Sequence, residues 1–268
     1  MCVFGCYQSE RGNELLNRLS ASIILFSVIS VLFTHQEKSH NEHSHNSRGR
    51  AQSEQTLRRG VDLSVAAGEF VALVGPTGNG KTTLLSLLAG LEETETGQVI
   101  LAGRDLADLS EDGIADLRGR SIGMIYQSIN LFGGFSVLEN VGLPLRLMLR
   151  PPFDAHGRAR ERLESAGLTS LSAGFPADLS GGQRQLVAIA RVLAADPALI
   201  LADEPAANLD SATARLRALV DDGRHGVLLA THDLRVASQA DWIISLRDGQ
   251  IVKERALGLG RPSREVLA

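Results

Sequence analysis

Continuously apolar segments alternate with helical patterns along the chain after residue 60. Three runs contain almost only apolar residues: Phe70–Val74, Ala198–Ala202 and Gly226–Ala230. Such runs are typical of parallel strands that are buried on both faces. Residues 181–195 instead repeat their apolar positions at three- and four-residue intervals, which indicates a helix with one packed face. The pattern favours an α/β core.

Shorter elements complete this pattern. We expect strands over 61–65, 97–103 and 122–126, a mainly helical stretch over 137–168 with breaks at Pro144, Pro151 and Pro152, and a closing hairpin over 242–252.

A glycine-rich turn follows the strand Phe70–Val74 and leads into an expected helix. It contains the pattern G-x-x-x-x-G-K-T. In such a loop, backbone N–H groups surround phosphate oxygens, Lys81 reaches the β- and γ-phosphates, and the Thr82 hydroxyl ligates Mg²⁺. The strand before and the helix after favour a nucleotide site over a turn that binds nothing. The expected nucleotide-binding residues are Gly75, Pro76, Thr77, Gly78, Asn79, Gly80, Lys81, Thr82 and Thr83.

Polar side chains stand at the ends of three expected strands. Gln127 follows one, Asp203 and Glu204 follow the second, and His232 follows the third. Ligands of α/β sheets bind at this edge. A lone histidine after a strand is more often structural, but here it repeats the pattern of the other two strand ends.

A second glycine-containing segment, Ser180-Gly181-Gly182-Gln183, opens the helix over 181–195. Its backbone N–H groups would stand at a helix N-terminus, where anions bind.

Together these motifs resemble the ABC transporter ATPase family over about residues 57–255. Gly75–Thr83 resembles its Walker A motif, Gln127 its Q-loop glutamine and Leu179–Gln183 its signature sequence, LSGGQ. Leu199–Glu204 is similar to Walker B with the catalytic glutamate. Asn208-Leu209-Asp210 resembles the D-loop, and His232 the switch histidine.

The resemblance implies a P-loop NTPase (RecA-like) α/β core, an antiparallel β part and a helical signature subdomain over about 128–195. It also implies ATP hydrolysis by a head-to-tail homodimer. One subunit would hold ATP with its P-loop, and Ser180, Gly181, Gly182 and Gln183 of the other would close on the γ-phosphate.

The resemblance further assigns chemical roles. Thr82, Gln127 and Asp203 would hold Mg²⁺, and Glu204 would act as general base on the attacking water. His232 and Gln127 would sense the γ-phosphate. Closure of the dimer would act on membrane permease subunits through a groove near residues 128–150, at the cytoplasmic face of the cell membrane.

Within the family, the strings around Tyr126–Leu131 and Leu138–Pro144 are similar to the branch that serves lipoprotein release and macrolide or peptide export. This implies an exporter.

Residues 1–56 read as an atypical extension. The uncharged run 21–33 is short for a membrane span and closer to a signal or interfacial segment. If it enters the membrane, the arginines that follow keep its C-terminal side cytoplasmic. A tract with His35, His40, His43 and His45 follows, for which we prefer a linker over a metal site. Residues 256–268 read as a tail.

The length, composition and net charge of the chain limit the classes of partner that we expect. The chain has 268 residues, 44% of them hydrophobic, and a net charge of −4, which suits one large core and argues against a nucleic-acid partner. The two cysteines, Cys2 and Cys6, lie outside the expected core. A disulfide framework is therefore not expected.

Four departures from the family pattern stand out. No aromatic residue lies between Phe33 and Phe70 to stack on adenine. Three alternatives stay open: His45 takes that place, adenine binds weakly, or another segment replaces the usual first strand. Leu186 stands where the family has arginine, and Ala206 where it has threonine. The segment from Asp210 to His232 is shorter, which predicts a trimmed helix and a displaced histidine. Two alternatives stay open: a degenerate nucleotide-binding protein with little turnover, and a non-transport ABC ATPase.

Overall fold

The computed structural model describes residues 27–32, 61–94, 97–148, 154–205 and 209–257. None of the helices in these ranges combines the length and the hydropathy that a membrane span needs. The His-rich tract, the stretch from Arg48 to Arg59, and Ala206 and Asn208 lie outside the described residues.

The main sheet has six strands in the order β10-β9-β3-β8-β7-β6. All neighbours are parallel except β10 and β9, which form the expected closing hairpin. Every residue of β3 and of β8 is buried, as the apolar runs predict. The strands are β3 (Phe70–Val74), β6 (Ile122–Ile125), β7 (Leu199–Asp203), β8 (Gly226–Thr231), β9 (Trp242–Arg247) and β10 (Gln250–Ala256).

A smaller sheet has the order β2-β1-β4-β5 and is antiparallel. Its strands are β1 (Ser27–Leu32), β2 (Leu63–Ala66), β4 (Gln98–Leu101) and β5 (Arg104–Asp105).

Strand β1 lies within residues 1–56, which the sequence pattern marks as an atypical extension. Ser27–Leu32 lies between β2 and β4 and pairs with both. The segment SVISVL is rich in Val and Ile, which favour strands, and its backbone groups supply partners for both neighbours. These six residues are thus part of the small sheet, and the division of the chain into 1–56, 57–255 and 256–268 stays a prediction.

Removing residues 1–32 should destabilise the protein more than removing residues 1–26. Only the longer deletion takes away β1, the strand with which β2 pairs in this sheet. We expect a loss in the free energy of unfolding of about 3 kcal/mol or more, because several backbone hydrogen bonds disappear together. Urea unfolding of the two truncated chains measures it, and equal midpoints would show that β1 adds nothing.

Helices cover both faces of the main sheet because successive residues of its buried strands point to opposite sides. Val71 and Leu73 pack with α2 and the small sheet, whereas Phe70 and Ala72 pack with α7 and α8. The helices of this part are α2 (Lys81–Leu88), η1 (Leu106–Asp108), α3 (Glu111–Ser121), α7 (Leu209–Asp221) and α8 (Leu234–Ala237).

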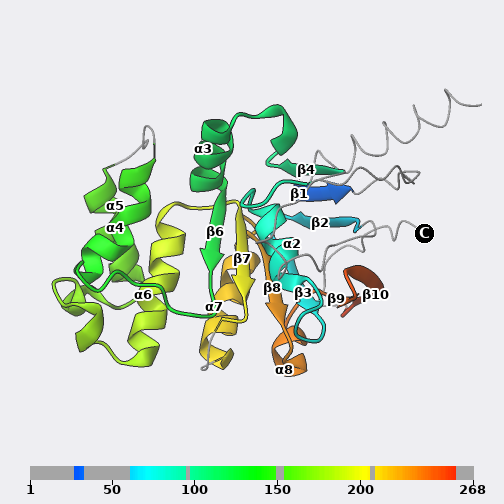
Figure 1. Cartoon of the computed structure of the whole chain (residues 1–268). Helices are drawn as coiled ribbons and strands as arrows, with labels where there is room; N and C mark the ends of the chain where they lie inside the picture. The colour runs from blue at the N-terminus through cyan, green and yellow to red at the C-terminus, as the bar shows by residue number, and fades with distance from the viewer. Residues whose placement is uncertain (1–26, 33–60, 95–96, 149–153, 206–208, 258–268) are drawn as a thin grey trace, which may run out of the picture.

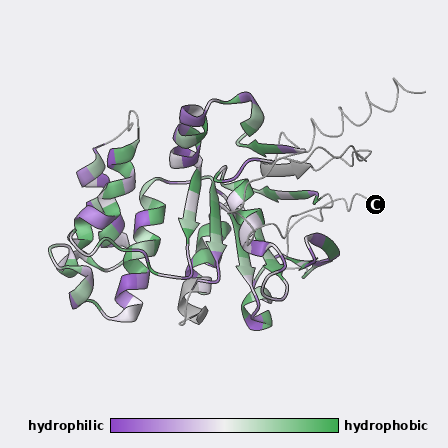
Figure 2. Cartoon of the chain, viewed as in Figure 1, coloured by the Kyte–Doolittle hydropathy of each residue, from purple (hydrophilic) through white to green (hydrophobic). Residues whose placement is uncertain are grey.

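A helical lobe stands beside the β6 edge of the main sheet (Figure 1). Its own apolar core includes Val141, Leu145, Leu163 and Val187. In Figure 2 the helices of this lobe carry both hydrophobic (green) and hydrophilic (purple) segments. Pro144 lies inside a helix and does not break it, contrary to the sequence prediction. The elements are α4 (Val137–Leu147), α5 (Ala155–Ser165), η2 (Thr169–Leu171), η3 (Pro176–Asp178) and α6 (Gly181–Ala194).

Asp196 joins the lobe to the main sheet. Its Oδ1 lies 3.1 Å from Arg162 Nη2 of α5 and 3.7 Å from Arg224 Nη1, which precedes β8. Arg158 of α5 lies 3.8 Å from the other oxygen. The buried ring of His225 reaches across with Nδ1 2.7 Å from the carbonyl of Pro197. One carboxylate thus connects α5 with the residues that lead into β7 and β8.

Candidate nucleotide site

The expected functional residues meet at one edge of the main sheet. Strands β3, β8, β7 and β6 are neighbours and run parallel, so their carboxyl ends lie side by side. The P-loop follows β3, His232 follows β8, Asp203 and Glu204 end β7, and Gln127 follows β6. This is the ligand-binding edge of an α/β sheet.

The P-loop closes around the side chain of Lys81. Its Nζ donates to the carbonyls of Gly75 and Pro76 at 2.9 and 3.1 Å, and the side chain is almost fully buried. Gly80 caps α2 with φ at 89°, a conformation that favours glycine. A side chain on Gly75 would overlap the carbonyl oxygen of Leu246 on β9. The backbone geometry therefore requires these glycines.

Thr82 and Asp203 converge from two elements. Thr82 Oγ1, in the first turn of α2, donates to Asp203 Oδ2 at 2.9 Å. Both residues retain access to solvent. Two oxygen donors next to a phosphate-binding loop suit Mg²⁺, which prefers oxygen ligands and keeps part of its coordination for phosphates and water.

Glu204 and His232 form a pair. His232 Nδ1 lies 2.9 Å from Glu204 Oε1, and the glutamate side chain is 21% exposed. The Glu204 N–H donates to the Ala230 carbonyl on β8, and its φ is +39°. Such a backbone is uncommon outside glycine and gathers at functional sites. The short segment before β8 does not separate His232 from the carboxylate, contrary to the expectation of a displaced histidine.

Asp233, next to this pair, carries a permanent charge. The Arg235 side chain, with Nη2 2.8 Å from Asp233 Oδ2, lowers the pKa of Asp233 to about 2. The same carboxylate accepts from the Arg235 N–H and caps α8. Asp233 therefore stays ionised at neutral pH.

Ser180 caps α6 through a reciprocal motif. Its Oγ accepts from Gln183 N, and Gln183 Oε1 accepts from Ser180 N. The N–H groups of Gly181 and Gly182 begin the helix without partners inside it. These residues belong to the lobe, and among the described residues no hydrogen bond joins them to the P-loop. Leu186 packs against the lobe core, and α6 is continuous through this position. Leucine in place of the family's arginine therefore does not disturb the helix.

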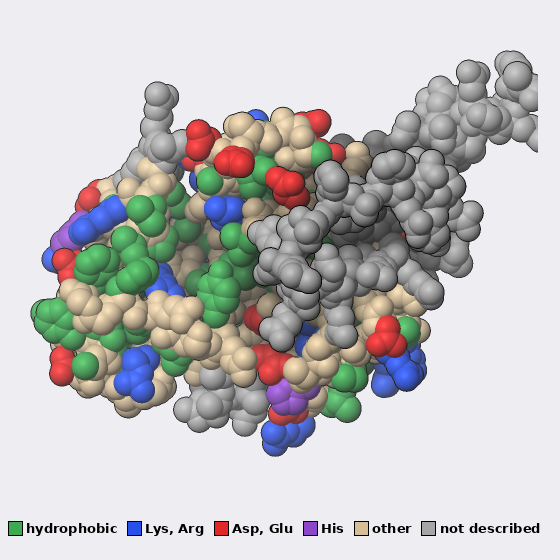
Figure 3. Space-filling model, in the orientation of Figure 1, with side chains coloured by type: hydrophobic (Ala, Val, Ile, Leu, Met, Phe, Trp, Pro, Cys, Tyr) green, Lys and Arg blue, Asp and Glu red, His purple; other side chains and the backbone are tan. Residues whose placement is uncertain are grey.

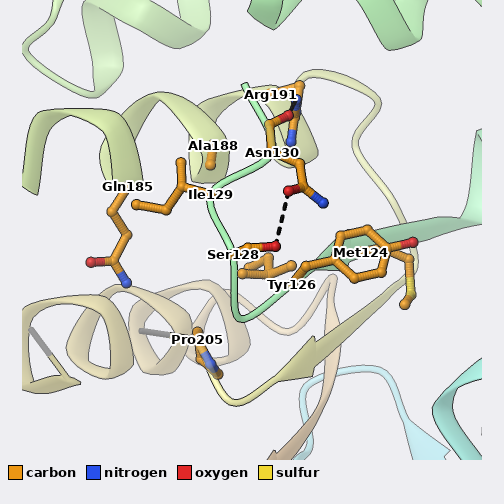
Figure 4. A pocket seen from close by; sticks show the side chains of 10 residues that line it. Met124, Tyr126, Ser128, Ile129, Asn130, Gln185, Ala188, Arg191 and Pro205 are labelled. Atoms are coloured by element: carbon orange, nitrogen blue, oxygen red, sulfur yellow. Dashed lines mark hydrogen bonds between the residues drawn. The ribbon is translucent and has the colours of Figure 1, made fainter. Parts of the chain in front are cut away.

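Gln127 is exposed directly after β6. The segment that follows it turns back against α6, where Arg191 Nη1 donates to the carbonyl of Asn130 at 2.5 Å. Ser128 Oγ donates to Asn130 Oδ1 at 2.9 Å (Figure 4). The pocket under this turn holds only about 10 Å³, room for about one water. It is not the nucleotide site.

Asn140 is a buried residue that the sequence reasoning missed. Its Nδ2 donates to the carbonyls of Phe132, Phe135 and Ser136, each at 3.0 Å, and its Oδ1 accepts from Phe132 N at 2.8 Å. It thus fixes the loop between the Gln127 segment and α4. An asparagine inside an amphipathic helical stretch is the only sequence signal that could have revealed this role. In the structure the Asn140 side chain has no exposed surface.

Replacing Asn140 by alanine should lower the free energy of unfolding by about 2–4 kcal/mol, because it removes four hydrogen bonds of a buried side chain and leaves the Phe132 N–H and the Phe135 carbonyl without their partner. Chemical denaturation measures the loss. Asn130→Ala is the matched control, since its side chain is exposed and bonds only Ser128 among the described residues. Equal midpoints for the two variants would contradict the role of Asn140.

Comparisons with known proteins agree with this geometry. The model of the ABC transporter family matches residues 58–207. The lipoprotein-releasing system ATP-binding protein LolD of Chromohalobacter salexigens is 42% identical over 204 residues, which cover 74% of this chain and 86% of LolD. The macrolide export ATP-binding/permease protein MacB of an Azoarcus species is 42% identical over 206 residues, 75% of this chain.

The chain spans only about a third of the fused relatives: 31% of that MacB and 32% of the pyoverdine export ATP-binding/permease protein PvdT of Pseudomonas entomophila, which is 42% identical. A solved dimeric bacterial ABC transporter cassette superposes with a TM-score of 0.68 at 33% identity, covering 85% of this chain and 98% of the cassette. The same cassette was also solved as a dimer in a post-hydrolysis state bound to ADP and phosphate; this structure gives a TM-score of 0.67 at 33% identity and covers 85% of this chain and 98% of the cassette. The chain therefore belongs to the ABC transporter family and is an ATP-binding ATPase of that family.

Proposed function

We propose that this chain is the ATP-hydrolysing subunit of an exporter, in the branch of lipoprotein release and macrolide efflux. One observation carries the proposal: at the sheet edge that the P-loop shares, Thr82 is hydrogen-bonded to Asp203, and His232 Nδ1 lies 2.9 Å from Glu204 Oε1. The relatives named above support the direction of transport, and their names give the chemistry of the cargo only for those proteins.

In this proposal the triphosphate lies along the P-loop. Lys81 is already aligned by two carbonyls and carries the charge that neutralises the β- and γ-phosphates. Thr82, Asp203 and Gln127 are the residues that would hold Mg²⁺, which would supply positive charge to offset the negative charge of the phosphates. Two oxygen atoms support a Mg²⁺ site here: Thr82 Oγ1 and Asp203 Oδ2 lie 2.9 Å apart at this edge of the sheet.

Glu204 is placed to accept a proton from the attacking water, because its carboxylate is partly shielded from solvent and stands next to the loop. His232 Nδ1 orients that carboxylate from 2.9 Å. Most of the rate gain then comes from positioning.

The site is completed by a second copy of the chain. Ser180 and Gly182 lie in the lobe, away from the loop of their own chain, and would reach the γ-phosphate held by the partner. The exposed N-terminus of α6 offers N–H groups to that phosphate. ATP would therefore hold two subunits together until it is hydrolysed.

A membrane permease would dock in the groove between the lobe and the main sheet. This groove holds about 800 Å³ and is lined by α3, β6, α4 and α6. Figure 3 shows hydrophobic side chains gathered between the lobe and the sheet on this face. The proposal places the subunit at the cytoplasmic face of the membrane.

Light scattering with and without Mg-ATP tests the proposal. The full chain should pair when Mg-ATP is present and separate after turnover, and it should release phosphate. Binding of ATP without phosphate release would favour the degenerate alternative. A chain that neither pairs nor hydrolyses would refute the proposal.

A further inference from the structure

The helix α6 carries a buried amide that no neighbouring protein group satisfies. Gln185 is only 8% exposed, and no hydrogen bond joins its side chain to another residue in the ranges that the structure describes. A buried polar group without a partner is destabilising, and such groups are nearly always bonded to protein or to an ordered water. The Gln185 amide therefore needs a partner that the described protein groups do not supply.

The Gln185 side chain borders the small pocket under the turn that follows β6. Gln185, Ala188 and Arg191 recur every three residues along α6, so they lie on one face of the helix, and all three line the pocket. Figure 4 shows the Gln185 amide extending from this helix on the side where Pro205 lies. The pocket holds about 10 Å³, which is enough for one water but for no larger ligand.

Polar groups that can bond a water surround this space. The Ser128 hydroxyl donates to Asn130 Oδ1 and keeps its own lone pairs as acceptors. Arg191 uses one of its five N–H donors on the Asn130 carbonyl. With the Gln185 amide, these groups supply the roughly three partners that a buried water usually has. The pocket therefore has both the room and the polar lining for one ordered water.

The same pocket touches three functional segments. Ser128 comes directly after Gln127, and Pro205 comes directly after Glu204. The third segment is α6 itself, which begins at the Ser180 cap. A bonded link inside the pocket would fix the positions of the residues after Gln127 and Glu204 against α6.

We infer that Gln185 is a positioning residue of this ATPase: its amide holds one water in the pocket, and the two together keep the turn 128–130 and Pro205 in place against α6. Through these neighbours Gln185 sets the positions of Gln127 and Glu204, and it does not contact the nucleotide. The inference rests on the proposed function, because it concerns the reaction at that site.

Steady-state phosphate release by variants of the full chain tests the inference. Gln185→Met keeps the length of the side chain and loses the amide that holds the water. We expect kcat to fall about tenfold, because Gln127 and Glu204 lose their fixed positions. KM for ATP should stay within about twofold, because the P-loop is unchanged. Gln185→Glu keeps a polar end of the same length, and its kcat should stay within about threefold of the wild type.

A purely structural role for Gln185 would give a different pattern. The urea midpoint of Gln185→Met should not fall, because an apolar chain replaces a buried amide that no protein group satisfies. Gln98→Met is the matched control, since Gln98 is exposed on β4, and it should match the wild type in both measurements. An unchanged kcat in Gln185→Met, or a loss of kcat that only accompanies a lower midpoint, would overturn the inference.

A second variant addresses the water itself. Ala188→Val adds two methyl groups to the pocket wall, which displaces the water while Gln185 remains. We expect a similar fall in kcat, and the double variant with Gln185→Met should be no slower than the slower single variant, because both changes remove the same water. Losses of kcat that multiply in the double variant would contradict a shared water.

Crystal structures of the full chain separate this inference from the proposed function. The wild type should show one water within hydrogen-bond distance of the Gln185 amide, and Gln185→Met should show none. A wild-type chain that hydrolyses ATP but lacks this water refutes only the inference. A wild-type chain that holds the water but releases no phosphate refutes the proposed function, and the positioning role with it.

Discussion

Replacing Glu204 by glutamine will stop ATP turnover and preserve ATP-dependent pairing. We expect kcat to fall by about 10²–10⁴, the usual contribution of a general base. Glutamine has the shape of glutamate and keeps a contact with His232, now 2.9 Å from Glu204 Oε1, but it does not accept the proton of the attacking water. Steady-state phosphate release measures turnover, and light scattering with Mg-ATP measures pairing.

The control for this variant is Glu164→Gln, an exposed position on α5, which should retain normal turnover. Rapid hydrolysis by Glu204→Gln would refute the assignment of the base. Loss of pairing as well as turnover would instead place Glu204 in the binding of nucleotide.

Replacing Lys81 by alanine will weaken ATP binding about a hundredfold. Lys81 is the only cationic side chain of the loop 75–83, and its Nζ is held at the loop by the carbonyls of Gly75 and Pro76. A charge-assisted contact with phosphate that is lost from a desolvated site costs about 3 kcal/mol, or roughly a hundredfold in Kd. Titration with a fluorescent ATP analogue measures the loss.

Lys253→Ala provides the comparison, since Lys253 is an exposed residue of β10 far along the chain from the loop. Its affinity for ATP should equal that of the wild type. If Lys81→Ala binds the analogue as tightly as this control, the loop is not the phosphate site.

The sequence predicted the main sheet and its functional edge because both follow from local patterns. The fully apolar runs of β3, β7 and β8 indicate strands that are buried on both faces. Because the carboxyl ends of such parallel strands share one edge of the sheet, the polar residues that follow them are expected to lie close together. The capping pair of Ser180 and Gln183 likewise lies within four consecutive residues.

Features that depend on distant partners could not be read in this way. β1 is a strand because β2 and β4 lie on either side of it, and these neighbours are far away in the sequence. Pro144 is accommodated in α4 because the lobe packs around that helix. The environments of Asn140 and Arg191 follow from the path of one loop against α6, for which the sequence carries no local signal.

Asp196 has a mechanical consequence. It lies at the amino ends of β7 and β8, while Glu204 and His232 lie at the opposite ends of the same two strands. The two paired strands therefore connect the two sites. At their amino ends, Arg158 and Arg162 of the lobe contact Asp196. At their carboxyl ends lie Glu204 and His232. Because β7 pairs with β8 along its whole length, we expect a tilt of the lobe to reach both strands together and to leave the 2.9 Å contact between Glu204 and His232 intact.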